Sequence, residues 1–491
     1  MKYNVRVVYD DMARKSEAIE DVIGNHGFAN VVVKKKKLLT YYMENLTNIF
    51  QPMTMDTLSS IYDLDKLYHD LNTDSMPDNE ERIIHCFSNF IFSDFEQAQL
   101  SFRKVHFINQ TYKMISGENV VAISFSNRSA YLSFLARALK SGGSDSTKEL
   151  TKDIVGVIPI EGMTNIGEMR NFIQCITGNF DARFFNSLQG DDFIVVKRST
   201  NKKKIKMEYQ FYQMLPDDMK YWFVMPFHYE ENNEYASYMM ERLHMTDVAI
   251  KWVHGSFSQI EFEELLDKYF FFFNCRHRKE VSACEYDQIA DALYIDKVAE
   301  RIDDLIQLPE YGQISNVIHA CGVDIRDLYS KYLLIKEKIE STKSVELVSV
   351  IGHGDPCFSN ALYSKFTRTL KFIDPKGALE PCDLWTNPYY DLAKLSHSIC
   401  GLYDFINNNL FEIYLNESFE YMLKIDFDNQ AYVDIFKRKL GENGFDYQLV
   451  RLYEASLFLS MLPLHIDVPY KVVGFILNAK RILEELSEND E

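Results

Sequence analysis

Three polar side chains in the second half of the chain have the types and spacing that phosphoryl transfer requires. Asp355 and Asn360 lie in the segment HGDPCFSN, residues 353–360, and Asp374 follows a short apolar run. A carboxylate such as Asp355 can accept the proton of a hydroxyl group. The oxygens of an amide and a second carboxylate, here Asn360 and Asp374, are suitable Mg²⁺ ligands.

Two apolar runs flank this loop and must position its side chains. Glu346–Ile351 precedes the loop and Thr369–Ile373 leads into Asp374, and both are rich in β-branched residues. We expect two strands that could pair and gather the three oxygen-bearing side chains at their ends.

A lysine and a glutamate upstream could serve the same chemistry. Lys197 ends the run FIVVK, Phe193–Lys197, and Glu208 lies in a segment with helical periodicity, Lys204–Leu215. A buried lysine needs a counter-ion, and the pair could direct an ammonium group at nucleotide phosphates. The alternative is a solvated basic face, because Lys197 begins a basic run that continues through residues 202–204.

The elements around Lys197 predict a small lobe. Phe172–Ile176, Ala182–Leu188 and Phe193–Lys197 read as antiparallel strands before the predicted helix. Tyr235–Leu243 reads as a further strand that runs into a connector. We place a hinge there, at residues 239–243, whose backbone could bind an adenine edge.

The segments on either side predict a helical lobe and a separate N-terminal domain. Apolar residues recur at helical spacing in Ser258–Asn274, Glu285–Ile306 and Val323–Glu340, which predicts a helical base for the loop. Residues 1–160 alternate strand-like and helical runs, for example Asn4–Tyr9 and Asn119–Phe125, and predict an α/β domain with a partly parallel sheet.

The function of that first domain is open between a nucleotidyltransferase-like enzyme and a docking module. Its Asp63-Leu64-Asp65 has the spacing of a metal-binding D-x-D, although the start of a solvated helix explains it as well. We place the domain boundary near residue 160, after the Gly- and Ser-rich segment at residues 140–149.

Composition restricts the class of protein. The formal net charge of −19 over 491 residues disfavours nonspecific binding to nucleic acid or anionic membranes. The eight cysteines show no disulfide or zinc pattern, which suits a reducing cytoplasm. The most apolar run, Tyr269–Phe273, is far shorter than the roughly 20 residues that span a bilayer.

These motifs resemble a known superfamily. His353-Gly354-Asp355-x-x-x-x-Asn360 with Ile373-Asp374 is similar to the H-G-D-x-x-x-x-N and I-D motifs of aminoglycoside phosphotransferases and choline kinases, which share the protein-kinase-like fold. Asp391-Leu392-Ala393 resembles the D-x-A that follows in that superfamily. The similarity covers about residues 165–480 and implies an α+β fold of two lobes, with residues 161–245 and 246–491 forming the small and large lobes.

The resemblance implies a role for each matched residue. Asp355 would be the catalytic base, Asn360 and Asp374 the Mg²⁺ ligands, and Lys197 the contact to ATP phosphates, held by Glu208. His353 and Asp391 would support the loop structurally. Gly178 and Asn179 lie in a turn that resembles the phosphate-covering turn of the superfamily. With Lys197 and the hinge residues Met240, Glu241 and Leu243, they are the expected nucleotide contacts.

The turn at Gly178 departs from the family pattern. It holds one glycine and is followed by Phe180 and Asp181, and an acidic side chain near ATP phosphates is unfavourable unless it points away.

A narrower resemblance concerns the substrate. HGDPCFSN with IDPKG is similar to phosphotransferases of bacterial capsule and surface-glycan synthesis. We expect the pocket for a small-molecule acceptor to use Lys376, Asp383, Trp385 and Tyr389, whose rings and charges could stack on a sugar or cage a quaternary ammonium. Tyr389 could instead pack beneath the loop.

Three functions therefore remain open. The first is a cytoplasmic ATP- and Mg²⁺-dependent kinase acting on a hydroxyl of a sugar-like precursor of a surface glycan. The second keeps the chemistry but takes choline, another amino alcohol or an aminoglycoside as the acceptor. The third is a catalytically inactive kinase-like scaffold, which the joint presence of Lys197, Asp355, Asn360 and Asp374 disfavours. The oligomeric state is open.

Overall fold

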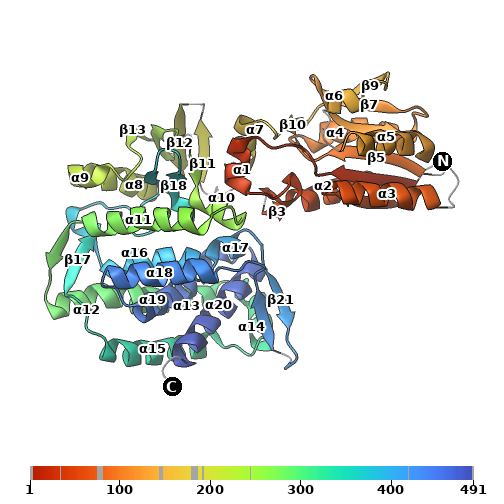
Figure 1. The fold of residues 1–491 in the computed structure, drawn as a ribbon. Coiled ribbons are helices and arrows are strands. Elements are labelled where there is room, and N and C mark those ends of the chain that lie inside the picture. Colours follow the sequence, from red (N-terminus) through yellow and green to blue (C-terminus); the bar gives the residue numbers. More distant parts are fainter. Residues whose placement is uncertain are drawn as a thin grey trace. The chain divides into compact units, whose positions relative to one another are not determined.

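The chain folds as two compact units, Met1–Phe180 and Asp181–Glu491 (Figure 1). The structure is a computed structural model that describes residues 4–33, 35–74, 81–142, 147–177, 186–190, 193–243, 245–418 and 420–488. Each unit has its own sheets and its own buried apolar residues.

The first unit is built on a mixed sheet, as the sequence predicts. The strand order is β4-β1-β5-β8-β7-β9, with β1 parallel to β4 and β5, β8 antiparallel to β5 and β7, and β9 parallel to β7. The strands of this sheet are β1 (Asn4–Asp10), β4 (Met53–Leu58), β5 (Glu81–Phe87), β7 (Tyr112–Ser116), β8 (Asn119–Phe125) and β9 (Gly156–Pro159). Shorter strands are β2 (Val32–Val33), β3 (Lys36–Lys37), β6 (Phe90–Phe92) and β10 (Met163–Asn165). The helices are α1 (Glu17–Ile23), α2 (Leu38–Thr47), α3 (Ile61–Thr73), α4 (Phe95–Phe102), α5 (Arg128–Lys140), α6 (Thr147–Leu150) and α7 (Met169–Thr177).

The boundary between the units corrects the predicted one. It lies after residue 180, about 20 residues beyond the predicted position. β10 pairs antiparallel with β6, and α7 contacts α1 and β2, so this stretch belongs to the first unit. The Gly- and Ser-rich segment lies between α5 and α6 and is an internal loop. Composition marks a loop, whereas only long-range pairing decides which unit a segment joins.

Residues 172–176 also correct the prediction, because they are helical. They lie in α7, where Phe172 and Ile176 are fully buried. The run is too short to separate strand from helix by composition, and the spacing of four between its buried residues fits a helix face.

The second unit begins with an antiparallel sheet of order β11-β12-β14-β13. α8 packs on it, and Ile205 of that helix is buried with Ala236, Tyr238 and Met240 of β14. The predicted strand that ends in Lys197 and the predicted helix that contains Glu208 are confirmed. The bounds are β11 (Asn186–Gly190), β12 (Ile194–Ser199), β13 (Pro226–Glu231), β14 (Ala236–Glu241), α8 (Lys202–Met214) and α9 (Asp217–Lys220).

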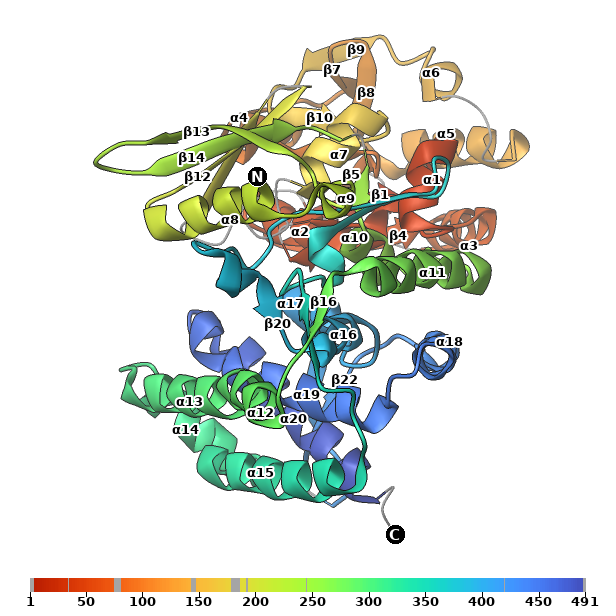
Figure 2. The same cartoon turned by 90° about the vertical axis from the view of Figure 1, so that its left-hand side faces the viewer.

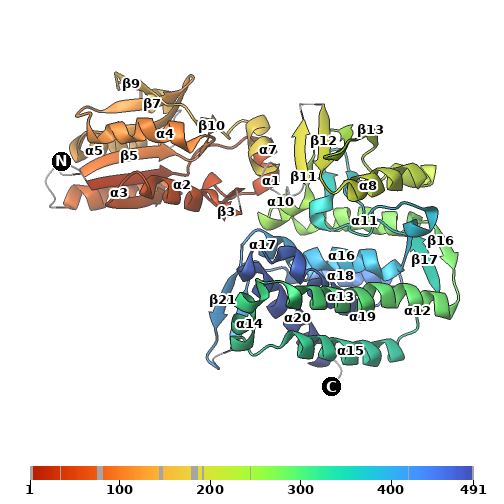
Figure 3. The same ribbon diagram turned by 180° about the vertical axis from the view of Figure 1, so that it is seen from behind.

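The rest of the second unit is mainly helical. Figures 1 and 3 show α13, α15, α19 and α20 side by side, and α19 contacts each of the other three. In the view turned by 90°, α13 lies beside α19 and α20, and α15 lies below them (Figure 2). The helices are α10 (Val248–Val253), α11 (Gln259–Cys275), α12 (Ala283–Asp291), α13 (Lys297–Gln307), α14 (Tyr311–Ala320), α15 (Ile325–Thr342), α16 (Pro388–Ile399), α17 (Tyr403–Asn407), α18 (Gln430–Glu442), α19 (Tyr447–Ser460) and α20 (Pro469–Glu488).

An aromatic cluster forms the core beneath the predicted loop. Trp252 of α10 is fully buried, and its ring contacts Phe262 and Phe358. The indole nitrogen of Trp252 donates to the carbonyl oxygen of Ser398 at 3.1 Å. The Ser398 hydroxyl accepts from the backbone nitrogen of Phe358, also at 3.1 Å. The loop that contains Asp355 is therefore fixed to α10 and α16 by both packing and hydrogen bonds.

The runs that flank the loop do not pair with each other, which corrects the prediction. β17 (Val348–Ile351) lies between β16 (Arg278–Glu280) and β20 (Trp385–Thr386). β19 (Thr369–Phe372) pairs instead with β18 (Ala361–Ser364), which also pairs with β15 (Thr246–Asp247). A separate hairpin joins β21 (Glu412–Leu415) to β22 (Tyr421–Lys424). The short turn between β18 and β19 makes local pairing the less costly choice.

Asp247 gives this core a dependence on pH. Its carboxylate caps α10 by accepting from the backbone nitrogen of Ile250 at 2.8 Å. Burial, together with the nearby charge of Asp404, raises the pKa of Asp247 from 3.8 to about 7. In the unfolded chain the carboxyl group ionises near pH 4, whereas in the folded chain it keeps its proton to about pH 7. Stability is therefore lost as the pH rises from about 4 to 7.

We expect Asp247→Asn to raise the free energy of unfolding by about 2–4 kcal/mol at pH 8 and by almost nothing at pH 4. Asn is also a good N-cap residue, so the cap survives the change. Thermal unfolding at pH 4, 6 and 8 measures the effect. The matched control is Asp324→Asn at the exposed cap of α15, which should leave the pH dependence unchanged. An equal gain for Asp247→Asn at every pH would contradict the assignment.

Candidate active site

The loop at residues 353–355 is held by a buried carboxylate. Asp391 of α16 is fully buried and accepts from the backbone nitrogens of His353 at 3.1 Å and Gly354 at 2.8 Å. The guanidinium of Arg276, which follows α11, pairs with the same carboxylate at 3.0 Å. The Asp391 carboxylate therefore holds the backbone of the loop at His353 and Gly354.

His353 braces the loop from inside. Its Nδ1 accepts from the backbone nitrogen of Asp355, and its Nε2 donates to the carbonyl oxygen of Ile373, both at 3.0 Å. The ring stacks on Phe223 with an interplanar angle of 7°. Burial lowers the pKa of His353, although nearby carboxylates act to raise it. The ring is thus neutral, carries its proton on Nε2, and uses both nitrogens for structure.

Lys197 joins the sheet, α8 and the segment after β19. Its ammonium lies 2.7 Å from Oε2 of Glu208 and 2.7 Å from Oδ1 of Asp374. Lys197 and Glu208 are buried, and the hydroxyl of Tyr238 donates to Oε2 of Glu208 at 3.0 Å. The alternative of a solvated basic face therefore does not hold for Lys197, although it suits the exposed Lys203.

Charge and burial compete at Asp374. Burial acts to raise the pKa of this carboxyl group, but the charge and hydrogen bond of Lys197 outweigh it, and the pKa lies below its usual value. The backbone of Asp374 is left-handed, with φ of 57°. A non-glycine residue in this region is uncommon and marks a position that the surroundings impose.

The donor set at the loop fits Mg²⁺. The amide nitrogen of Asn360 donates to the carbonyl oxygen of Asp355 at 2.9 Å, which turns the amide oxygen the other way. Asp374 remains 34% exposed and offers carboxylate oxygens. Among the described residues, no group of three or more His, Cys, Asp and Glu side chains could hold a metal ion. One amide and one carboxylate suit Mg²⁺, which keeps waters and takes phosphate oxygens as its other ligands.

The segment after Asp374 passes tightly against α8. The backbone nitrogen of Ala378 donates to the carbonyl oxygen of Met207 at 3.0 Å. Gly377 has φ of +85°, and a Cβ there would lie 2.7 Å from Cβ of Met207 and 3.0 Å from the backbone nitrogen of Glu208. Only glycine fits this crossing without moving the helix that carries Glu208.

We expect Gly377→Ala to destabilise the second unit by about 1–3 kcal/mol, because the new methyl group must displace α8. Binding of ATP, measured by calorimetry, should weaken as Glu208 moves. The matched control is Gly312→Ala in α14, where a Cβ meets no atom within 4 Å. This control should be neutral or stabilising by about 0.5–1 kcal/mol, since alanine favours helix more than glycine does. Unchanged stability and ATP affinity in Gly377→Ala would show that this crossing does not control α8.

The residues matched to nucleotide contacts are placed only in part. Met240 lines a pocket that also contains Asp374, and it lies near the end of β14. Glu241 ends that strand and is exposed, and Leu243 follows it. Gly178 and Asn179 lie outside the described residues. The lining of the pocket is Glu208, Tyr212, Phe223, Val224, Pro226, Tyr238, Met240, Phe372, Ile373, Asp374 and Pro375.

The predicted acceptor residues lie in different settings. Tyr389 is buried, and its ring packs against Phe445 and Tyr453. The Asp383 carboxylate accepts hydrogen bonds from the backbone nitrogens of Leu379 and Glu380. The ring of Trp385 lies below the ammonium of Lys279, 5.0 Å from ring centroid to Nζ. Lys376 is the one of the four that runs beside the loop, next to Gly354.

Two charged residues at the loop are absent from the sequence predictions. Lys394 of α16 pairs with Oδ1 of Asp355 at 3.1 Å, and Arg276 pairs with Asp391. Lys394 lies three residues after Asp391, so helical spacing places both on the same face and could have indicated it. Arg276 lies 115 residues before its partner, and nothing local in the sequence indicates their contact.

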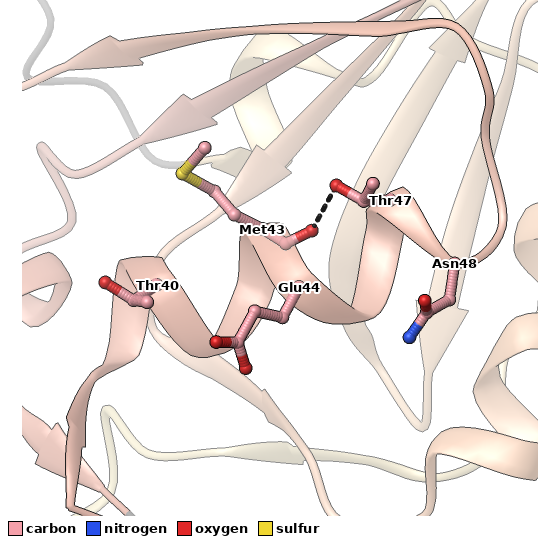
Figure 4. A pocket seen from close by; sticks show the side chains of 5 residues that line it. All are labelled: Thr40, Met43, Glu44, Thr47 and Asn48. Atoms are coloured by element: carbon pink, nitrogen blue, oxygen red, sulfur yellow. Dashed lines mark hydrogen bonds between the residues drawn. The ribbon is translucent and has the colours of Figure 1, made fainter.

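Two features of the first unit show no comparable chemistry. The D-x-D aspartate Asp63 lies in the first turn of α3, which Ser60 caps: its Oδ2 accepts from the Ser60 hydroxyl at 2.9 Å, and its backbone nitrogen donates to the Ser60 oxygen at 3.3 Å. A surface depression on α2 is lined by Thr40, Met43, Glu44, Thr47 and Asn48 (Figure 4). Its drawn hydrogen bond is internal to the helix, from the Thr47 hydroxyl to the carbonyl oxygen of Met43.

Comparisons with known proteins return solved structures alone. No family model matches the chain, and no curated protein matches it either. Spectinomycin phosphotransferase, solved with ADP and spectinomycin, is 10% identical with a TM-score of 0.37, and the match covers 62% of this chain and 86% of that one. A thermostable mutant of an aminoglycoside phosphotransferase, solved with AMP-PNP and hygromycin B, is 11% identical with a TM-score of 0.37, covering 64% and 97%.

An ethanolamine kinase from Plasmodium vivax is 10% identical with a TM-score of 0.32, and the match covers 70% of this chain and 94% of that one. All three TM-scores lie below 0.5, and likenesses this weak imply no function for this chain. In the described part of the chain, no helix is both long enough and apolar enough to cross a membrane.

Proposed function

We propose that the second unit is a small-molecule kinase that transfers the γ-phosphoryl group of ATP to a hydroxyl group. In this proposal the unit has the two-lobed protein-kinase-like architecture, with the sheet and α8 as the small lobe. The observation that supports it most is the position of Lys197, which contacts Glu208 and Asp374 at once. A lysine held in this way beside a Mg²⁺-binding carboxylate is the arrangement that phosphoryl transfer uses.

The residues of the loop supply the remaining roles. The acceptor hydroxyl oxygen bonds to the γ-phosphorus while the bond from that phosphorus to the β,γ-bridging oxygen breaks and ADP leaves. The hydroxyl proton passes to Asp355, and Lys197 orients the phosphates. When bound by Asn360 and Asp374, Mg²⁺ would neutralise charge on the phosphate oxygens. Catalysis of this kind consists mainly of alignment and charge stabilisation.

We propose that the acceptor is a small molecule. More specifically, we propose a sugar or sugar-like precursor of a capsule or surface polysaccharide. The proposal of a sugar acceptor is based on the similarity of residues 353–360 and 373–377 to glycan phosphotransferases. We place the reaction in the cytoplasm, where ATP and reduced thiols are available. All eight cysteines are free thiols.

A coupled assay for ADP release tests the proposal. Full-length protein is incubated with ATP and Mg²⁺ and with a panel of sugars, amino alcohols and aminoglycosides. We expect release of ADP that depends on an acceptor, with the phosphorylated product seen by mass spectrometry. Binding of ATP without transfer to any acceptor would favour the inactive scaffold instead.

A further inference from the structure

Three lysines contact the proposed base, its loop or the neighbouring helix α16, and give this side of the site a positive charge. Lys394 of α16 pairs with Asp355 at 3.1 Å. Lys297, the first residue of α13, donates to the hydroxyl of Tyr390 at 2.8 Å. The stem of Lys376 runs along Gly354: its Cβ, Cγ and Cδ lie 2.6–2.7 Å from the position that a Cβ of Gly354 would occupy. We call Lys297, Lys376 and Lys394 the lysine cluster.

Tyr390 of α16 contacts Lys297 and lies on the same helix as Lys394. Its ring is buried, and the ammonium of Lys297 lies 5.2 Å from the ring centroid. Burial acts to raise the pKa of Tyr390, but the charges of Lys297 and Lys394 outweigh it, and the pKa is lowered. Lys297 and Lys394 therefore both lie close enough to Tyr390 to influence its hydroxyl group.

The carboxylates nearby do not balance this charge. The Asp391 carboxylate pairs with Arg276 and accepts hydrogen bonds from two backbone nitrogens. The Asp383 carboxylate accepts hydrogen bonds from two other backbone nitrogens. Among the described residues, no carboxylate lies within 4.0 Å of the ammonium group of Lys297 or Lys376, and Asp355 alone pairs with Lys394. A site with more cations than anions is a site for an anionic ligand, and it stands out in a chain with a net charge of −19.

We propose that the acceptor is an anionic hydroxyl compound, such as a sugar or polyol that carries a phosphate or a carboxylate. Lys297 and Lys376 bind the anionic group, Lys394 holds the carboxylate of Asp355 in position, and the acceptor hydroxyl lies at Asp355. This inference rests on the proposed kinase activity and narrows its substrate class. Cationic acceptors such as choline or an aminoglycoside are disfavoured, because they would face like charges.

The test compares acceptors that differ in charge. Full-length protein is assayed with ATP and Mg²⁺ on a hexose, the hexose 6-phosphate, the hexuronate, glycerol 3-phosphate and choline. We expect kcat/KM to be at least about tenfold higher for the charged sugars than for the neutral hexose, and the phosphate and carboxylate arms to show which anion is preferred. Equal or better turnover of the neutral or cationic acceptors would overturn the anionic assignment and leave the kinase proposal intact.

Variants of the lysine cluster test whether these side chains bind the anionic group of the acceptor. Lys297→Met and Lys376→Met should raise KM for the anionic acceptor about tenfold or more while KM for ATP stays unchanged, which also shows that the variants are folded. Lys376→Glu should reduce the preference for anionic over neutral acceptors further. The control is Lys424→Met on the exposed β22. If KM for ATP rises instead, the lysines bind nucleotide phosphates, and the inference is wrong.

A binding measurement covers the case in which no acceptor is turned over. Calorimetric titration with the hexose 6-phosphate and the hexuronate should show binding that Lys297→Met weakens. Binding without any transfer would refute the kinase proposal but support the anion site. Absence of binding by both anions, in protein that still binds ATP, would refute the anion site.

Discussion

Asp355→Asn is expected to lower kcat by about 10²–10⁴-fold, while the affinity for ATP changes little. The amide keeps the shape of the side chain but cannot accept the hydroxyl proton. The loop should stay in place, because His353 and Asp391 hold its backbone rather than this side chain. Acceptor-dependent ADP release in the steady state measures the loss.

The control for this prediction is Asp217→Asn, since the Asp217 side chain on α9 is 98% exposed. It should retain full activity and the same melting temperature. Equal transfer by wild type and Asp355→Asn would rule out Asp355 as the base, whatever the acceptor.

Lys197→Met is expected to lower kcat/KM for ATP by about 10²–10³-fold. The change removes the cation that contacts both Glu208 and Asp374 and leaves two carboxylates near the phosphates without it. Because Lys197 holds the pKa of Asp374 below its usual value, that pKa should rise in the variant. The acidic limb of the pH–rate profile should therefore move to higher pH, since Mg²⁺ needs the ionised carboxylate.

The matched control for Lys197 lies in the same basic run. Lys203→Met on the exposed side of α8 removes one positive charge from the same region and should change kcat/KM less than twofold. If both variants lose activity equally, a general electrostatic attraction of ATP explains the effect. If the acidic limb of the pH–rate profile stays at the same pH in Lys197→Met, Lys197 does not control the ionisation of Asp374 during turnover.

The individual strands and the helix of the site can be predicted from the sequence. The strand that ends in Lys197, the helix with Glu208 and the strand before Asp374 each form where their residue patterns predict them. The ion pair between Lys197 and Glu208, expected from a strand followed by a helix, forms at 2.7 Å. These features depend on side-chain periodicity over a few residues, which is a local property.

Very short elements and contacts between distant parts of the chain could not be predicted from local residue patterns. Residues 172–176 were expected as a strand, but five apolar-rich residues fit either period, and burial in the first unit made them helical. β18 was missed because four residues give too little pattern, and its pairing with β19 separated the two flanking runs. The unit boundary moved to residue 180 because a strand pairing, β10 with β6, spans more than 70 residues.

The sequence by itself determined which groups are present for the proposed chemistry: a carboxylate for the base, an amide and a carboxylate for Mg²⁺, and a lysine with a glutamate. Only the tertiary structure decided how these groups are held and charged. The contact of Arg276 with Asp391, of Lys394 with Asp355 and of Lys297 with Tyr390 each joins separate helices or loops. Such contacts are set by the packing of helices around a common core, which no local pattern encodes, and they place the lysine cluster beside the proposed base.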